Sequence, residues 1–292
     1  MLPCCLIISN RRELIVRTVF TLFLVLNLSF VTFGHCSEIQ KRSFQSKFLN
    51  RMWPHRVYVP TGYEEGNSHY PVLYLFHGNG GNEKSWTENG QLQKLIDSYI
   101  ENGTIKPLLI VMPSAFVSWY VDGEEKKESA IIKELIPWVE KEYRAKPQRS
   151  SRLVAGLSAG GFGACRYAFA YPELFCSAGL FAPAIYNPVP PPHSSARKAR
   201  AFHQPFSAKR WRQLNYTGLF KQYFQQELRV PMFIVSGDDD HFNIEIHSLA
   251  LYEKLRRKGH PAQLRIIDGG HEWKVYFGGL KMALPWLMSF VD

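Results

Sequence analysis

The sequence predicts an α/β fold built on a mostly parallel sheet with helices on both faces. Short apolar runs alternate with helical patterns along most of the chain, and the connections are long enough for crossover helices. Residues 72–76 form an unbroken apolar run, which is typical of a strand covered on both faces. With 292 residues, 46% of them hydrophobic and 21% charged, the chain can bury a sizeable core.

The expected elements follow from these patterns in chain order. Strands are expected at 56–59, 72–76, 108–112, 153–155, 178–181, 232–235 and 263–267. Helices are expected at 91–101, 125–143, 161–170, 244–258 and 273–290. Pro137 should kink or restart the second helix, because proline has no N–H group to donate. No internal repeat follows the N-terminal segment, so one domain is expected over 37–292.

The alternation breaks between residues 183 and 229. Prolines cluster at 188–192, and the stretch 183–226 holds seven basic residues and no acidic one. Aromatic side chains are frequent in this stretch, whereas disordered linkers are poor in them. They are Phe202, Phe206, Trp211, Tyr216, Phe220, Tyr223 and Phe224. We therefore expect a basic, aromatic and ordered lid insertion at about 183–229.

The N-terminal segment has the order of a secretory signal peptide. Arg11, Arg12 and Arg17 precede an uncharged, mostly apolar run at 18–33. We expect residues 1–36 to be a signal peptide and the protein to be exported, to the periplasm or out of the cell. The run is short for a membrane span of about twenty residues. Anchoring in a membrane through 18–33 is the alternative.

The net charge of +10 names no partner by itself, since it fits either ordinary solubility or attraction to anionic substrates or surfaces. No nucleic-acid partner is predicted, and membrane contact is expected only through the N-terminal segment.

After Cys36, only Cys165 and Cys176 remain. We expect two buried thiols, with a single disulfide as the alternative. Neither cysteine has the spacing of a metal site.

The stretch Gly156-Leu157-Ser158-Ala159-Gly160 matches the G-x-S-x-G pattern of a nucleophile elbow. A strand that turns into a helix within one residue forces the serine into a strained conformation, and only small neighbours let the two backbones approach so closely. The pattern alone is weak. Its context strengthens it, because a predicted strand precedes Ser158 and a predicted helix follows it.

A serine becomes a nucleophile when a histidine removes its proton, and a carboxylate orients that histidine. Candidates for these partners follow the last two predicted strands, and the carboxyl ends of parallel strands share one edge of a sheet. His271 follows a strand and two glycines, so it is the expected base. Asp240 is the expected acid; its neighbours Asp238 and Asp239 compete with it, and Asp268 is a more remote candidate.

A tetrahedral intermediate also needs two backbone donors, the oxyanion hole. One is expected to be the amide of Ala159, directly after the serine. The loop 77–81 after the second strand is rich in glycine and should supply the other, and we favour Asn79. His77 is expected to order this turn rather than to act as a base. The loop lacks the Lys-Ser/Thr ending of a phosphate-binding loop, and neither a cofactor nor a metal is predicted.

Taken together, these motifs resemble the esterase D-like family of serine hydrolases, over roughly residues 53–291. The matching segments are 73–81 with Trp86, 112–113 with 119–122, 156–161, 237–240 and 269–273. That family includes feruloyl and acetyl xylan esterases, S-formylglutathione hydrolases, siderophore esterases and mycolyltransferases. The resemblance implies an α/β-hydrolase fold, with Asp240 as the acid and with Asn79 and Ala159 as the oxyanion donors.

The sequence thus predicts an exported carboxylic ester hydrolase that works through an acyl-serine intermediate on Ser158. Its substrate would be a small or polymer-linked ester, and the basic insertion suggests an anionic one. Acyl transfer to an alcohol acceptor is the alternative, because the same residues serve it. A non-catalytic domain would be expected to have lost at least one of these positions, and none is visibly lost.

Overall fold

The computed structural model describes residues 36–292. The predicted signal peptide or anchor therefore lies outside the described residues, apart from Cys36, which is exposed. Within 36–292, no helix is both long enough and apolar enough to cross a membrane. Cys165 and Cys176 are both buried free thiols, as expected.

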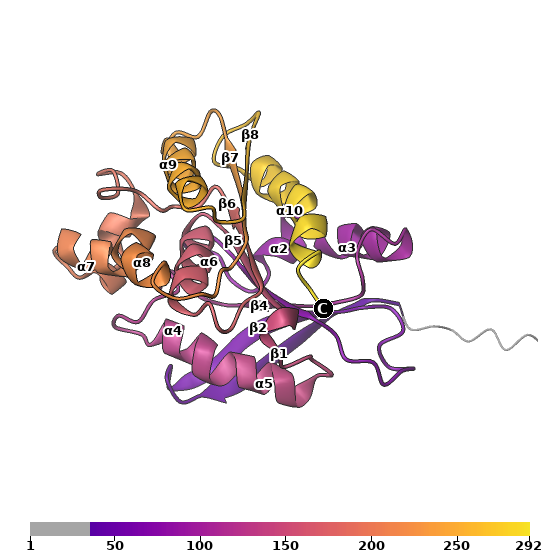
Figure 1. The fold of residues 1–292 in the computed structure, drawn as a ribbon. Helices are drawn as coiled ribbons and strands as arrows, with labels where there is room; N and C mark the ends of the chain where they lie inside the picture. The colour runs from indigo at the N-terminus through magenta and orange to yellow at the C-terminus, as the bar shows by residue number, and fades with distance from the viewer. Residues whose placement is uncertain (1–35) are drawn as a thin grey trace, which may run out of the picture. The chain divides into compact units, whose positions relative to one another are not determined.

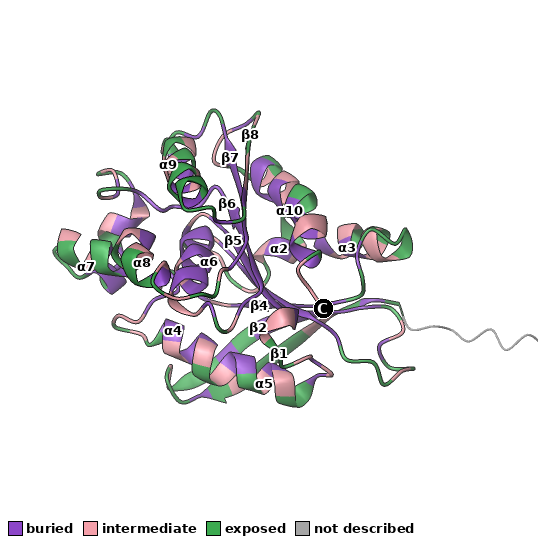
Figure 2. Cartoon of the chain, in the orientation of Figure 1, coloured by how far each residue is buried: buried purple, intermediate pink, exposed green. Residues whose placement is uncertain are grey.

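The described strands form one eight-stranded sheet in the order β1-β2-β4-β3-β5-β6-β7-β8. Strands β3 to β8 are parallel, whereas β1 and β2 run antiparallel to their neighbours. All residues of β3 to β7 are buried (Figure 2). The bounds are β1 Glu38–Ser46, β2 Arg51–Val59, β3 Val72–Phe76, β4 Leu109–Pro113, β5 Arg152–Leu157, β6 Ser177–Phe181, β7 Met232–Gly237 and β8 Ala262–Ile267.

Helices cover both faces of the sheet: α10, with α2 and α3 beside it, lies on one face, and α6 and α9 lie on the other (Figure 1). Their bounds are α2 Ser85–Glu88, α3 Leu92–Glu101, α4 Lys127–Ala130, α5 Ile136–Glu142, α6 Ala159–Ala170, α7 Ala208–Leu214, α8 Tyr216–Tyr223, α9 Ile244–Arg257 and α10 Trp273–Met288. The short helices are η1 Ile131–Leu135, η2 Arg149–Ser151, η3 Ser195–Lys198 and η4 Arg200–Phe202. The predicted fold class is therefore confirmed.

The sequence-based expectation was wrong at the N-terminal edge of the sheet. It missed β1 entirely and began β2 five residues too late, at 56 instead of Arg51. Strand β1 is paired on one side only and reads EIQKRSFQS, with mostly exposed or half-buried side chains. Charged edge strands of this kind discourage pairing with other molecules, and they lack the apolar run by which a buried strand is detected.

The predicted helix at 125–143 is three consecutive segments. Helix α4 passes into η1, a π-helical stretch, and then into α5, whose first turn contains Pro137. A proline is tolerated in a first turn because its missing N–H has no intrahelical partner there. The restart expected at Pro137 is thus confirmed, although a change of hydrogen-bond register accompanies it.

The stretch between β6 and β7 is ordered, as expected, and contains η3, η4, α7 and α8. Helices α7 and α8 each have a buried and an exposed side (Figure 2). Four of the aromatic residues that predicted order are almost fully buried: Phe202 in η4, Trp211 in α7, and Tyr216 and Tyr223 in α8. Trp211 stacks on Phe162 of α6 with ring centroids 5.1 Å apart. That this insertion acts as a lid stays a prediction.

A buried ion pair joins three parts of this layer. Arg166 of α6 donates two hydrogen bonds, each 2.9 Å long, to the carboxylate of Glu128 in α4. It also donates to the carbonyl oxygen of Leu214 at the end of α7. Tyr171 donates a further 2.7 Å bond to Glu128. Both charged side chains are nearly excluded from water, so each charge depends on the other for compensation.

We expect Arg166→Met to lower the free energy of unfolding by about 3–5 kcal/mol, because it leaves the Glu128 carboxylate buried without its partner. Urea unfolding at pH 7 measures this change. Arg257→Met is the matched control, since Arg257 pairs with Glu253 on the exposed face of α9. That change should cost less than about 1 kcal/mol. Equal losses for the two variants would contradict the assigned role of the buried pair.

Candidate active site

Three chemically complementary side chains meet at the carboxyl edge of the sheet. Ser158 directly follows β5, Asp240 lies three residues after β7, and His271 lies four residues after β8. These strands are parallel, so their carboxyl ends lie at one edge. Residues separated by more than a hundred positions in the chain become neighbours in this way.

Ser158 sits in a turn that only small neighbours permit. It adopts φ 51° and ψ −115°, a conformation that non-glycine residues rarely take. A Cβ atom on Gly156 would lie 2.4 Å from the carbonyl oxygen of Gly160, and one on Gly160 would lie 2.5 Å from that of His77. The carbonyl oxygen of Ser158 accepts hydrogen bonds from the amides of Phe162 and Ala184. This geometry is that of a nucleophile elbow.

His271 lies between the serine and an aspartate. Its Nε2 is 2.9 Å from Ser158 Oγ, and its Nδ1 is 2.7 Å from Asp240 Oδ2. An ionised carboxylate only accepts hydrogen bonds, so Nδ1 donates to it and Nε2 is left to accept from the serine hydroxyl. Asp240 Oδ1 accepts a 2.9 Å bond from the amide of Phe242, and the Asp240 side chain is excluded from solvent.

The three consecutive aspartates have different surroundings, and only Asp240 lies beside His271. Asp238 Oδ1 accepts from the amide of Gly269, and Asp239 is exposed. Asp268, the remote candidate, is exposed and pairs with Lys274. The structure therefore separates residues that adjacency in the sequence could not.

Three acidic side chains that the sequence did not predict to lie together form a cluster nearby. One carboxylate oxygen from each of Asp238, Asp239 and Asp268 lies within 4.8 Å of the other two, and all three residues are exposed. These could supply ligands to a cation. The hydrogen bond from Gly269 and the ion pair with Lys274 already engage two of them.

The loop after β3 lies against the elbow, and its backbone amides differ in whether they have a hydrogen-bond acceptor. The amide of Gly80 donates to the carbonyl oxygen of Phe116, and that of Gly81 donates to Gly78. Among the hydrogen bonds of residues 36–292, none engages the amide of Asn79. The Asn79 side chain is held by Trp119, whose indole Nε1 donates to Oδ1 at 3.1 Å. Trp119 belonged to a matching motif, but the sequence did not assign it this contact.

Ala159 is the first residue of α6, and it is buried. The first amides of a helix have no intrahelical acceptor, so the Ala159 N–H group is available to a ligand. The helix dipole adds a partial positive charge at the same end. The amides of Ala159 and Asn79 are thus both candidates to bind a developing negative charge.

His77 is a structural histidine of this loop. Its Nε2 accepts a 2.8 Å hydrogen bond from the amide of Ala115, so its Nδ1 carries the proton and donates to Gly78. The side chain is 1% exposed, and burial lowers the pKa of His77 to about 4. It is therefore neutral at pH 7 and ties the loop to the segment after β4, in agreement with the ordering role expected of it.

Ser158 and His271 open onto a cleft of about 640 Å³. Its walls come from the loop 78–81 and the residues around His271, including Phe242, Trp273 and Tyr276. The rings of Phe242 and Tyr276 contact the His271 ring edge-on, with centroids 5.0 Å and 5.2 Å away. These contacts fix the imidazole in position while Nε2 stays accessible from the cleft.

Fold and geometry together define an α/β-hydrolase in which hydrogen bonds link a serine to a histidine and that histidine to an aspartate. The chain belongs to the Esterase family, described as "Putative esterase", because the model of that family matches residues 46–287. This confirms the resemblance to serine esterases found in the sequence.

Named relatives agree with this family. The chain is 35% identical to an endo-1,4-beta-xylanase/feruloyl esterase of Xylanibacter ruminicola over 161 aligned residues. The alignment covers 52% of this chain and 22% of that longer protein. Over 233 residues it is 23% identical to an acetyl esterase of Caldicellulosiruptor saccharolyticus, covering 76% and 84%. A solved ferulic acid esterase superposes with a TM-score of 0.75 at 26% identity, covering 87% of this chain and 98% of that one.

The buried His77 predicts a pH dependence of stability. Its pKa is 6.5 in the unfolded chain and about 4 in the folded protein. Below pH 6.5 the unfolded state binds a proton that the folded state does not, so this contribution is complete above pH 6.5 and is lost as the pH falls toward 4. The difference corresponds to about 3 kcal/mol.

His77→Gln keeps an acceptor for the Ala115 amide but does not titrate. We expect its free energy of unfolding to fall less steeply between pH 6.5 and 4 than that of the unmodified protein, measured by urea unfolding. His69→Gln is the control, because His69 is exposed and its pH dependence should match the unmodified protein. Identical slopes for His77→Gln and the unmodified protein would contradict the assignment.

Proposed function

We propose that this protein is a carboxylic ester hydrolase with Ser158 as nucleophile, His271 as base and Asp240 as orienting acid. The observation that carries the proposal is the continuous hydrogen-bond chain from Ser158 Oγ through His271 to Asp240. Membership of the Esterase family supports the same activity. The family match rests on residues 46–287, whereas the geometry concerns three side chains within them.

The reaction begins when His271 Nε2 removes the proton of Ser158 and the hydroxyl oxygen attacks the ester carbonyl. Asp240 stabilises the resulting imidazolium through Nδ1. The imidazolium then gives its proton to the leaving alcohol, which leaves an acyl-serine. A water molecule, deprotonated by the same nitrogen, attacks the acyl-serine and restores Ser158 with release of the acid.

The amides of Asn79 and Ala159 would bind the oxyanion of both tetrahedral intermediates. The Ser158 amide donates to the carbonyl oxygen of Phe181, so it is occupied elsewhere. The anchoring of Asn79 by Trp119, and of the loop by His77, supports this role. Donors held in place before the reaction stabilise the developing charge without a cost of reorganisation.

Water is the proposed acceptor, since the relatives described above are named as esterases. Their names concern feruloyl and acetyl esters, and for this chain we propose esters of such small acids, free or linked to a polymer. Product analysis with an added alcohol acceptor would detect acyl transfer, and accumulation of a transfer product would overturn hydrolysis as the main reaction.

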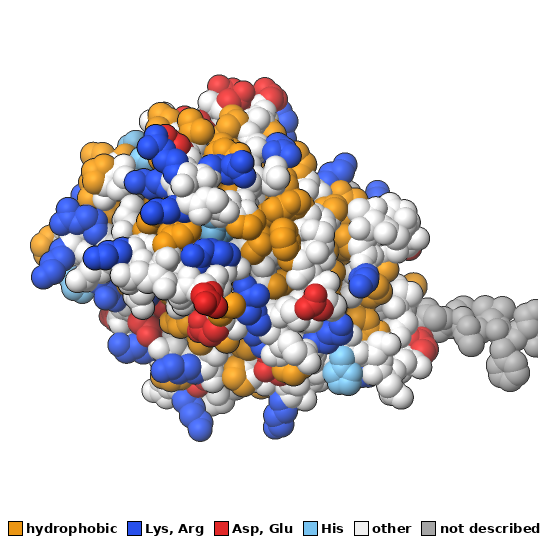
Figure 3. All heavy atoms as spheres, viewed as in Figure 1, with side chains coloured by type: hydrophobic (Ala, Val, Ile, Leu, Met, Phe, Trp, Pro, Cys, Tyr) orange, Lys and Arg blue, Asp and Glu red, His pale blue; other side chains and the backbone are white. Residues whose placement is uncertain are grey.

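Export and a preference for anionic esters remain proposals from the sequence. Lys and Arg side chains gather over α7, α8 and α9 (Figure 3). Several basic groups of the insertion serve the fold, however: Arg210 donates to the carbonyl oxygen of Asp122, and Arg197 lies over the ring of Phe206. The remaining charge supports long-range attraction only, so kcat/KM for an anionic ester should fall as salt rises, and that of a neutral ester should not.

Substitution at the site tests the catalytic assignment. We expect Ser158→Ala to abolish labelling by a fluorophosphonate probe and to lower kcat for 4-nitrophenyl acetate by about 10⁴-fold or more. Asp240→Asn should lower kcat by about 10⁴-fold, because an amide no longer holds the required tautomer of His271.

The adjacent aspartates are matched controls. Asp238→Asn and Asp239→Asn change the same type of side chain in the same loop without touching His271, and both should retain kcat within about threefold of the unmodified enzyme. If Asp239→Asn lost activity and Asp240→Asn kept it, the acid would be wrongly assigned. Undiminished turnover by Ser158→Ala would overturn the proposed function.

A further inference from the structure

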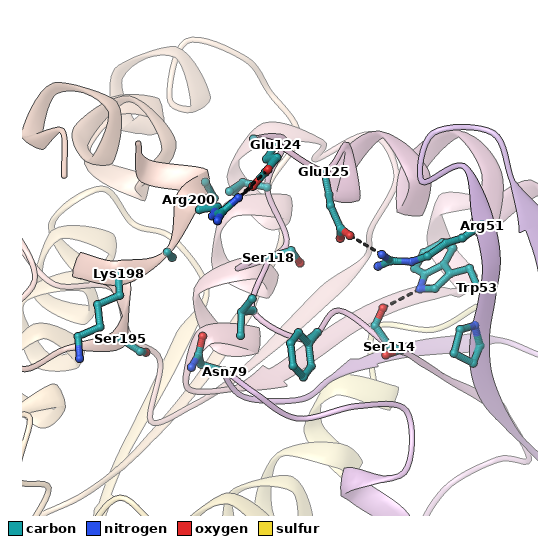
Figure 4. A pocket seen from close by; sticks show the side chains of 17 residues that line it. Arg51, Trp53, Asn79, Ser114, Ser118, Glu124, Glu125, Ser195, Lys198 and Arg200 are labelled. Atoms are coloured by element: carbon teal, nitrogen blue, oxygen red, sulfur yellow. Dashed lines mark hydrogen bonds and ion pairs between the residues drawn. The ribbon is translucent and has the colours of Figure 1, made fainter. Parts of the chain in front are cut away.

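Lys127 is a buried charged residue that the mechanism above does not use. It is the first residue of α4, and its side chain has no exposed surface. Its Nζ lies 3.3 Å from the carbonyl oxygen of Ser114 and 3.6 Å from Glu125 Oε2. Glu125 already has a closer partner in Arg51, at 2.6 Å (Figure 4). Neutralising Glu125 therefore does not by itself account for a buried lysine here, where an uncompensated charge costs free energy.

The carbonyl oxygen of Ser114 accepts hydrogen bonds from two buried side chains. The indole Nε1 of Trp53, in β2, donates to it at 2.6 Å (Figure 4), and Lys127 Nζ donates to it at 3.3 Å. Burial lowers the pKa of Lys127 to about 8, so the side chain is mostly protonated at pH 7 and its bond to Ser114 is charge-assisted. Ser114 directly follows β4, so these two donors fix the chain where that strand ends.

The next two residues of the chain hold the loop of the proposed oxyanion donor. The amide of Ala115 donates to His77 Nε2 at 2.8 Å. The carbonyl oxygen of Phe116 accepts from the amide of Gly80 at 2.9 Å. These two bonds lie on either side of Asn79 in the loop. The orientation of the Asn79 amide accordingly depends on where this short segment lies.

The segment 114–120 contains three residues with a backbone conformation that side chains disfavour. Phe116, Trp119 and Tyr120 adopt φ of 50°, 56° and 60°. Residues other than glycine stay in this region only where their surroundings fix them. The two side-chain hydrogen bonds at its first residue fix where the segment starts. Losing one of them lets the strained backbone relax, and the loop that it contacts shifts with it.

We propose that Lys127 is a positioning residue of the oxyanion hole. By holding the Ser114 carbonyl oxygen, its ammonium group fixes the segment 114–120 and, through it, the amide of Asn79. Lys127 does not line the catalytic cleft, so it acts without touching the substrate. This inference rests on the proposed function and deepens it, because a donor that is held in place stabilises the oxyanion without a cost of reorganisation.

Lys127→Met tests the inference, because methionine is unbranched and adaptable in a core but neither donates a hydrogen bond nor carries a charge. We expect kcat for 4-nitrophenyl acetate to fall about tenfold, less than the loss of about 10²–10³-fold that follows removal of an oxyanion donor. KM should stay within about twofold, since acylation and deacylation both pass through an oxyanion and slow together. Titration of active sites with a fluorophosphonate gives kcat per competent enzyme, so a variant that is only less stable keeps its kcat.

Lys133→Met is the matched control. Lys133 also lies over an aromatic ring, that of Phe48 at 5.9 Å, but it is exposed and belongs to η1. Its kcat and KM should equal those of the unmodified enzyme within about twofold. Trp53→Phe removes the other donor to Ser114 while keeping an aromatic ring, and it should lower kcat per titrated site as Lys127→Met does. It carries the test if Lys127→Met does not fold.

A double variant tests the route through Asn79. Trp119→Phe removes the indole donor to Asn79 Oδ1 and should also lower kcat. Because both changes loosen the same amide, Lys127→Met combined with Trp119→Phe should lose less activity than the product of the two single losses. Losses that multiply would place the effect of Lys127 elsewhere and would overturn the inference.

The outcomes separate the two proposals. Turnover that depends on Ser158, with an unchanged kcat per titrated site in Lys127→Met, overturns the positioning role and leaves the esterase standing. A higher KM at unchanged kcat also overturns it, because Lys127 would then affect substrate binding instead of the oxyanion. Absence of Ser158-dependent turnover of every ester overturns the proposed function itself.

Discussion

The close approach of three backbone segments around Ser158 is the constraint on which the rest of the site depends. Strand β5, the first turn of α6 and the end of β3 meet so tightly that a methyl group on Gly156 or Gly160 would overlap a carbonyl oxygen. The serine accordingly takes a strained conformation, and its side chain is presented at the sheet edge. Packing of the buried strands β3, β5 and β6 around it supplies the free energy that maintains the strain.

Around this turn, hydrogen bonds to buried partners hold the polar groups in fixed positions. His77 stays neutral because burial disfavours its charged form, and its unprotonated nitrogen can therefore accept from Ala115. Asp240 is buried but has two hydrogen-bond donors, His271 and the Phe242 amide. Both cases follow one rule: a buried polar group is tolerated where its partner is fixed.

Much of the fold was predictable, because β3 to β7 bury both faces and so appear as apolar runs that turn residues separate. Strand β1 was not, because its pairing with β2 satisfies it without a buried face. At the site, Ser158 and His271 could be predicted from the residues at strand ends. The sequence favoured Asp240 but left Asp238 and Asp239 open, because the choice depends on which carboxylate the loop after β7 turns toward His271.

The sequence by itself determined the fold class, the elbow around Ser158 and the identity of its histidine, because these depend on local patterns and on chain order. Only the tertiary structure decided which aspartate contacts His271, how Trp119 and His77 hold the loop 77–81, and that Lys127 is buried against Ser114. These are contacts between segments distant in sequence, and their geometry is set by how helices and loops pack on the sheet, which no local pattern encodes.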